Sequence, residues 1–335
     1  MKTASKIPMR SPRAAALPSG FSLVELMVAM SIGLVLLAVV GSIFMATKRT
    51  FVSSDQRGRV HEASRLVHDV VGSMVRQAGF VDIANTPAGT NFPIIFDDIA
   101  RPPFGVDTGI VPVFACANGT INYTVPWSCT PNPAVMGQLP TDAIVLSYQS
   151  QPANAAVAGS GLVPFAGGVG GDCNGNNPLA AAAANAGEMP GPLPIAINEF
   201  YVGRGVTTTQ GGQSVQIPEL YCRGNGARAA PQPMAQGVEQ MRAFFHVGTG
   251  IGVNRVMRRL DAASVGNEWN NVDAVDLCVV MQSPSRVSLN GLVGGAPYTD
   301  CDGVARNSPD NRLRKANWFT FNLRNRTSTS SVLVF

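Results

Sequence analysis

The stretch Gly20-Phe21-Ser22-Leu23-Val24-Glu25-Leu26 lies where a basic leader meets a long apolar run. Residues 26–47 contain no charged side chain. About 20 helical residues, at roughly 1.5 Å each, cross the hydrocarbon core of a bilayer. The sequence therefore predicts a membrane-spanning helix over residues 21–47. A carboxylate at the mouth of such a span is costly and is usually kept for function, which makes Glu25 the first candidate functional residue.

The leader, residues 1–20, predicts the orientation of this span. It has no acid and four basic residues, Lys2, Lys6, Arg10 and Arg13. An excess of basic residues stays in the cytoplasm, so we expect a single-pass protein of the inner membrane with its C-terminal domain in the periplasm. A secretory signal peptide has a small-residue cleavage site after its apolar core. Here Gly20 precedes the apolar run, and cleavage there would leave the anchor on the mature protein.

The stretch resembles the type IV prepilin signal, in which a basic leader and Gly are followed by Phe-Ser/Thr-Leu-x-Glu-Leu. The resemblance implies that a prepilin peptidase cuts between Gly20 and Phe21, that Phe21 is then N-methylated, and that the protein moves into a pilus at the cell surface. It also implies that Glu25 pairs with the Phe21 ammonium of a neighbouring subunit. The physics agrees, because an unpaired buried charge costs several kcal/mol. The alternative is that Glu25 only reaches the lipid headgroups.

A second apolar pattern follows the span. After Arg49 the sequence turns polar, and no proline occurs from 21 to 86. Apolar residues then return with the spacing of one helix face: Leu66, Val67, Val70, Val71, Met74, Val75 and Ala78. The pattern predicts an amphipathic continuation of the helix over 48–79, with its stripe against a sheet and Gly79 as its C-cap.

Beyond Gly79 the sequence predicts a β-rich periplasmic domain over 80–335. Its candidate strands are rich in Val, Ile, Phe and Tyr and bounded by Gly, Pro and Asn: 94–97, 111–115, 120–125, 142–149, 195–202, 214–221, 236–247, 273–282, 317–325 and 331–335. A long loop is expected over 150–192 and a short helix over 255–264. The expected fold class is α+β and pilin-like: a long N-terminal transmembrane and amphipathic helix packed on a mainly antiparallel β-sheet domain with long loops.

Several blocks of this domain resemble the minor pilin family PilW. They are Thr141-Asp142-Ala143-Ile144-Val145-Leu146-Ser147-Tyr148, Asp172-Cys173-Asn174-Gly175, Glu219-Leu220-Tyr221-Cys222, Gly237-Val238-Glu239-Gln240-Met241, Trp269-Asn270-Asn271-Val272-Asp273-Ala274-Val275 and Phe321-Asn322-Leu323-Arg324-Asn325. The resemblance implies an assembly factor at or near the pilus tip, whose partners are other minor pilins and the major pilin. Segments 83–140 and 286–316 match no block of the family.

All six cysteines lie beyond the anchor. An even number on the outward side of a membrane favours disulfides, and six cysteines allow fifteen pairings. No CxxC pair occurs, which speaks against a zinc site. Cys173 and Cys222 lie in two of the PilW-like blocks, which implies that they pair. The pairs Cys116–Cys129 and Cys278–Cys301 are expected only from closeness in sequence.

The sequence offers little for catalysis. His61 and His68 are seven residues apart on one helix face, which fits either a solvated face or a metal pair. The run from Asp300 to Gly303 fits either a turn held by a disulfide or a set of calcium ligands. His246 has no evident nucleophile, and no serine elbow, P-loop or HExxH motif is present. We therefore expect no enzyme, no cofactor and no metal.

Charge and the resemblances leave three kinds of function open. The leader accounts for the net charge of +4, and the rest of the chain holds 21 basic and 21 acidic residues, which gives no case for nucleic-acid binding. The prediction is a structural minor pilin in type IV pilus assembly or priming at the tip. The alternatives are a minor pseudopilin of type II secretion, or a tip adhesin or ligand-binding module that uses 83–140 and 286–316. A membrane-anchored enzyme is the least favoured.

Overall fold

The computed structural model describes residues 20, 22–80, 111–122, 127–131, 139–149, 171–174, 195–210, 213–225, 230–250, 255–287 and 295–325. The chain forms two compact units, Met1–Phe51 and Val52–Phe335. The elements are α1 (Leu23–Gln77), β1 (Val113–Cys116), β2 (Gly119–Asn122), β3 (Ser128–Pro131), β4 (Ala143–Gln149), β5 (Ile195–Gln210), β6 (Gln213–Gly224), β7 (Gln232–Gln236), β8 (Val238–Thr249), β9 (Val256–Asp261), the 3-10 helix η2 (Glu268–Asn271), β10 (Val272–Gln282), β11 (Pro297–Thr299), β12 (Ala305–Asn307) and β13 (Arg314–Asn322).

Helix α1 begins in the first unit with an apolar stretch whose side chains are exposed in the isolated chain. Its most apolar 18-residue window has a mean hydropathy of 2.6 and no buried residue. Within the part of the chain that the structure describes, α1 is the one helix long and apolar enough to cross a membrane. Apolar side chains without a protein partner are stable in lipid. The helix therefore has the length and composition of a membrane anchor.

In the second unit α1 buries one face in the protein core. The buried apolar residues follow the helical period: Val60, Val67, Val70, Val71, Met74 and Val75. Most of the predicted stripe is thus buried, but Leu66 remains 44% exposed. Leu66 lies one position before Val67, about 100° around the helix axis, which turns it to the edge of the buried face.

Two contacts fix the C-terminal end of α1. Gly79 follows the helix with a positive φ of 75°, and its N–H donates to the carbonyl of Ser147 in β4 at 2.8 Å. The side-chain amide of Asn325 donates to the carbonyls of Arg76 and Gln77 at 3.2 and 3.1 Å. The last carbonyls of a helix lack partners within it, so Asn325 supplies a donor that they need.

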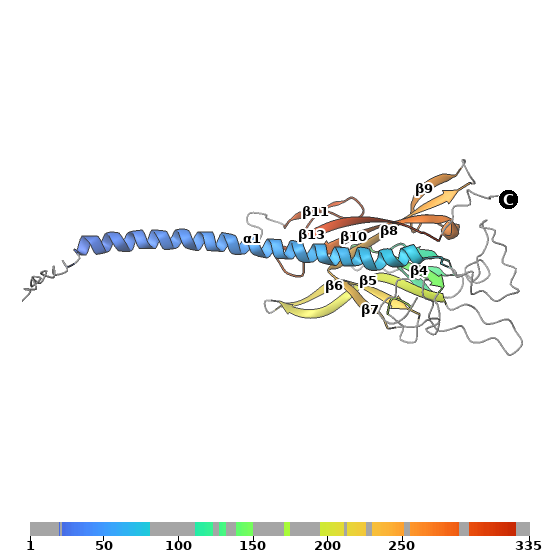
Figure 1. Cartoon of the computed structure of the whole chain (residues 1–335), viewed down its shortest axis with the longest axis horizontal. Helices are drawn as coiled ribbons and strands as arrows, with labels where there is room; N and C mark the ends of the chain where they lie inside the picture. Colours follow the sequence, from blue (N-terminus) through green and yellow to red (C-terminus); the bar gives the residue numbers. More distant parts are fainter. Residues whose placement is uncertain are drawn as a thin grey trace, which may run out of the picture. The chain divides into compact units, whose positions relative to one another are not determined.

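Among the described residues the strands form two larger sheets, and every pairing between them is antiparallel. The first has the order β1-β4-β5-β6-β7 and the second β13-β10-β8-β9, while β2-β3 and β11-β12 form two small hairpins. Figure 1 shows both larger sheets beside the second half of α1, and buried residues of all three share one hydrophobic core. The expected α+β fold class, a long helix on antiparallel sheets, is confirmed.

Asp142, just before β4, ties the first sheet to the second. Its backbone N–H donates to the carbonyl of Met241 in β8 at 2.7 Å. Its carboxylate accepts hydrogen bonds from the N–H groups of Ala243 and Asn118 at 2.9 and 3.1 Å and from Arg242 Nη1 at 2.6 Å. With 2% exposure, this carboxylate is a buried junction between the sheets.

Three disulfides join surface segments to the sheets. Cys116–Cys129 links β1 to β3, and Cys173–Cys222 links the turn at 171–174 to β6. Cys278–Cys301 links β10 to the turn between β11 and β12. These are the three pairs that the sequence and the family resemblance lead us to expect.

The structure corrects the expected short helix over 255–264, which is wrong. Val256–Asp261 is strand β9, and it pairs antiparallel with β8. In this strand Arg258 and Arg259 reach Glu268 and Asp276 at 2.5 and 2.8 Å. Tertiary pairing of this kind overrides weak local propensity.

Other strand boundaries also differ from the expectation. The strand expected over 236–247 is divided at Gly237, which has a positive φ of 82°, into β7 and β8. The strand expected over 317–325 begins and ends earlier, as β13. The ranges 94–97 and 331–335, and all of 150–192 except 171–174, lie outside the described residues.

Candidate functional site

The N-terminus of α1 is capped by Ser22. The Ser22 hydroxyl oxygen accepts a hydrogen bond from the Glu25 N–H at 3.2 Å, and the Ser22 carbonyl accepts one from Leu26 at 3.1 Å. Ser22 is thus the N-cap and Glu25 the third helical residue, the two key positions of a capping box. An acid in the first turn also interacts favourably with the helix dipole.

The capping role of Ser22 is not among the predictions made from the sequence, although its signal is present there. Ser followed three residues later by Glu, directly before an apolar run, is a known mark of a helix start. The motif that resembles a processing signal therefore also specifies where the helix begins. The backbone N–H of Glu25 thus belongs to the cap, and its carboxylate is the candidate for subunit contact.

The predicted processing and assembly residues are exposed where the structure describes them. Gly20 has no heavy atom within 4 Å of the place where a Cβ would stand. Glu25 is exposed on α1. Phe21 lies outside the described residues, so its cleavage, its methylation and its pairing with Glu25 stay predictions.

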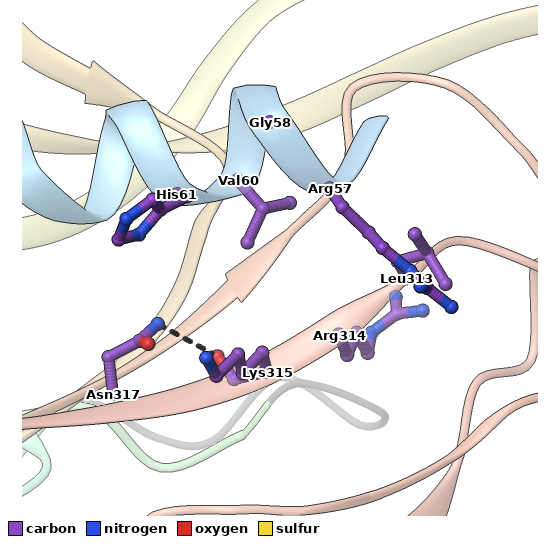
Figure 2. A pocket seen from close by; sticks show the side chains of 8 residues that line it. All are labelled: Arg57, Gly58, Val60, His61, Leu313, Arg314, Lys315 and Asn317. Carbon is purple, nitrogen blue, oxygen red and sulfur yellow. Dashed lines mark hydrogen bonds between the residues drawn. The ribbon is translucent and has the colours of Figure 1, made fainter. Parts of the chain in front are cut away.

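A groove of about 580 Å³ lies between α1 and β13 in the second unit. Figure 2 shows side chains of the helix and of the strand facing this space from its two sides. The lining residues are Arg57, Gly58, Val60, His61, Leu313, Arg314, Lys315 and Asn317. Four of these eight are basic or titratable to a cation, and none is an acid, so the groove has a cationic lining.

Arg314 is held by acids from outside the lining. Its guanidinium donates to Glu239 at 2.6 and 3.0 Å and to Asp310 at 2.5 Å. Burial opposes the charge of Arg314, but these hydrogen bonds raise its pKa above the usual value. Neither Arg57 nor Lys315 makes an ion pair or a side-chain hydrogen bond within the described ranges. The groove therefore has two cations available to a partner.

The two histidines of α1 have different surroundings. His68 packs its ring against Phe319 and Phe321, with centroids 5.3 and 5.2 Å apart, while His61 lines the groove. His246 Nε2 lies 3.0 Å from Asp276 Oδ2. In the part of the chain that the structure describes, no group of three or more His, Cys, Asp or Glu residues could hold a metal ion.

The carboxylates of the turn at Asp300 accept hydrogen bonds from the β11–β12 hairpin and from β8. Asp300 accepts from the N–H groups of Asp302 and Val304 at 3.0 and 2.8 Å and from Arg306 at 2.5 Å. Burial alone would raise the pKa of Asp300, but these hydrogen bonds hold it below the usual value. Asp302 accepts from Gln240 and Arg242, both at 3.0 Å. This arrangement favours a turn held by a disulfide over a set of calcium ligands.

Comparison with known proteins gives two family matches and similarity to solved structures. The model of the prokaryotic N-terminal methylation motif matches residues 18–41, and the model of the Type IV Pilus-assembly protein W family matches residues 199–325. No curated protein matches the chain. Among solved structures, the chain is similar to a type IV-like pilin from Thermus thermophilus, with 12% identity, a TM-score of 0.31, and coverage of 80% of this chain and 97% of that one.

The two family matches fall on different parts of the molecule. One covers the capped start of the apolar helix, and the other runs from β5 into the turn after β13. The second match includes the residues that hold both the Cys278–Cys301 disulfide and the end of α1. An apolar helix that matches the methylation motif and a sheet domain that matches the PilW family model over residues 199–325 together support a PilW-like type IV minor pilin in pilus assembly.

Proposed function

We propose that this minor pilin enters the type IV pilus at or near its tip, where it helps to prime assembly in a structural role. The family matches support a subunit of the assembly pathway, and the resemblance of the sheet domain to PilW supports the tip position. The proposed partners are other minor pilins and the major pilin.

Processing comes first in the proposed sequence of events. A prepilin peptidase removes residues 1–20 on the cytoplasmic side of the inner membrane, and Phe21 is methylated. The match to the methylation motif over 18–41 supports this step. The N-cap at Ser22 lies beyond the proposed cleavage site, so processing keeps the first hydrogen bonds of α1. The sheet domain then lies in the periplasm before the protein joins the fibre.

Glu25 carries the proposed assembly step. In the isolated chain it is an exposed carboxylate in the first turn of an otherwise apolar helix. Within a dry fibre core its charge requires a partner, and the new ammonium of Phe21 on a neighbouring subunit supplies the opposite sign. The favourable pairing depends on correct register, because a buried charge that loses its partner costs about 3–5 kcal/mol.

Glu25→Val tests this proposal. The variant should insert at least as well as the natural chain, because its span is wholly apolar, and cleavage after Gly20 should persist. Incorporation into sheared pili should fall by about two orders of magnitude or more, as expected from roughly 3–5 kcal/mol. Expression in a deletion strain, followed by counting of pili and immunoblotting of the sheared fraction, measures the effect.

Glu62→Val is the matched control, because Glu62 is an exposed acid of the same helix. It should leave incorporation unchanged. Normal pilus number and normal incorporation of a correctly cleaved Glu25→Val would refute the assembly role of Glu25. A tip subunit has a neighbour on one side only, so the expected loss is that of a single pair between Glu25 and a Phe21 ammonium.

A further inference from the structure

The face of β13 that meets α1 changes character along the strand. Near its end, Phe319 and Phe321 pack against His68 of the helix. Two and four residues before Phe319, the same face carries Asn317 and Lys315, because alternate residues of a strand share a face. The apolar contact between helix and strand therefore ends at Phe319, and the groove begins there.

The helix contributes a matching polar face. Arg57 and His61 are four residues apart and so lie on one side of α1, and both line the groove. Figure 2 shows the Arg57 side chain reaching toward the start of β13, with His61 facing the strand. The guanidinium of Arg57 and the ammonium of Lys315 thus reach one space from opposite walls.

Further cations lie near Arg314, one of the lining residues. Burial lowers the pKa of Arg312, Asp310 opposes this shift, and the neighbouring charges of Arg286 and Arg314 lower the pKa further. The acids of this region are engaged, since Asp310 and Glu239 both bind Arg314. A cleft lined by one sign of charge concentrates ligands of the opposite sign. The groove is therefore complementary to an anion.

We propose that this groove binds an acidic segment of a neighbouring pilus subunit, whose Asp or Glu carboxylates pair with Arg57 and Lys315. The inference rests on the proposed function. The two cations lie beside the apolar side chains of Val60 and Leu313 and the amide of Asn317. Such a mixture fits a polypeptide, which carries carboxylates on apolar stems and has backbone carbonyls to accept from an amide. Arg57 can hold a carboxylate by two parallel hydrogen bonds.

The chain allows a direct chemical test, because Lys315 is the only lysine after Lys48. A water-soluble carbodiimide activates a carboxylate and lets an adjacent lysine amine form an amide with it, without a spacer. Sheared pili that contain the natural protein are treated with the reagent, digested and analysed by mass spectrometry. The expected product joins Lys315 to an Asp or Glu of another subunit. Lys315→Arg keeps the charge and should lose only this product.

Charge reversal supplies the second test. Arg57→Glu combined with Lys315→Glu should lower the incorporation of the protein into sheared pili about tenfold or more, because like charges across an interface oppose binding. Arg65→Glu is the matched control: Arg65 is on the same helix, its side chain is 81% exposed, and it does not line the groove. This control should incorporate normally, and so should Arg57→Lys combined with Lys315→Arg.

The outcomes separate the two proposals. If the natural protein is absent from pili, the proposed function fails and this inference fails with it. If the protein is present but Lys315 is joined only to its own chain or to nothing, the groove does not bind a neighbouring subunit. Equal incorporation of the charge-reversed variant and Arg65→Glu would overturn the inference in the same way. The cross-link is measured on the natural chain, so a variant that fails to fold does not decide the result.

Discussion

Replacement of Asp142 by alanine should weaken the contact between the two sheets and so lower the free energy of unfolding. The Asp142 carboxylate is 2% exposed and accepts three hydrogen bonds, two from backbone N–H groups and one from Arg242. Burial raises the pKa of Asp142 in spite of these partners, so the charge is held there at a cost. Its contribution is to fix how the start of β4 meets β8.

The size of the effect follows from the groups that would lose their partner. Removal of one member of a buried ion pair costs about 3–5 kcal/mol, and a buried N–H without an acceptor costs about 1–3 kcal/mol. Arg242 keeps Asp302 at 3.0 Å, which reduces the loss. We therefore expect Asp142→Ala to lower the free energy of unfolding by about 3 kcal/mol. That is a large share of the roughly 5–15 kcal/mol of a typical domain.

Urea unfolding of the mature protein in detergent, followed by tryptophan fluorescence, measures this loss. Trp127 and Trp269 are buried in the shared core and report its opening. Asp69→Ala is the control, because Asp69 is 61% exposed and lies 3.8 Å from Arg65. Exposed pairs of this kind are worth about 0–1 kcal/mol. A loss for Asp142→Ala no larger than that of the control would refute the reasoning.

Three further predictions concern processing, packing and pH. Gly20→Leu should leave an uncleaved, membrane-inserted precursor, because a peptidase pocket shaped for glycine excludes a side chain; mass spectrometry that finds Phe21 at the N-terminus would contradict this. Gly72→Ala should lower the free energy of unfolding by about 1–3 kcal/mol, because a Cβ there would collide with the ring of Phe321; an unchanged urea midpoint would contradict it. Three carboxyl groups have a pKa below the usual value: those of Asp276, Asp300 and Asp310. Burial alone would raise each pKa, but hydrogen bonds to the carboxylate lower it. Their folded pKa lies below the unfolded value of about 3.9, so their stabilisation is complete above that value and is lost as the pH falls through the folded pKa. As the pH is lowered from about 5 to about 3, the urea concentration at the unfolding midpoint should therefore decrease. An increase of the midpoint over the same change of pH would contradict the prediction.

The sequence predicts best where one local pattern decides the structure. The charge-free run and the stripe at Val67, Val71 and Met74 define α1, because both patterns extend over several helical turns. The valine-rich segment of β10 is likewise recognisable as a strand. The pairing of Cys173 with Cys222, by contrast, is implied only by the resemblance of the blocks that contain them to the PilW family.

The sequence predicts the structure least well where segments that are distant in the chain meet. Strand β9 contains two consecutive arginines, and its strand character comes from its pairing with β8. The groove cannot be predicted from the sequence, because Arg57 and Lys315 lie near opposite ends of the second unit in sequence. Only the fold brings them together. The junction at Asp142 depends in the same way on β8.

The cap at Ser22 has a consequence for the design of the precursor. Ser22, Glu25 and Leu26, whose hydrogen bonds form the cap, all follow the proposed cleavage site. In the proposed processing, the cleavage machinery reads the leader, while the anchor carries its own cap. We therefore expect that leaders of different length or sequence that end in glycine can be exchanged without a shift in the phase of the helix.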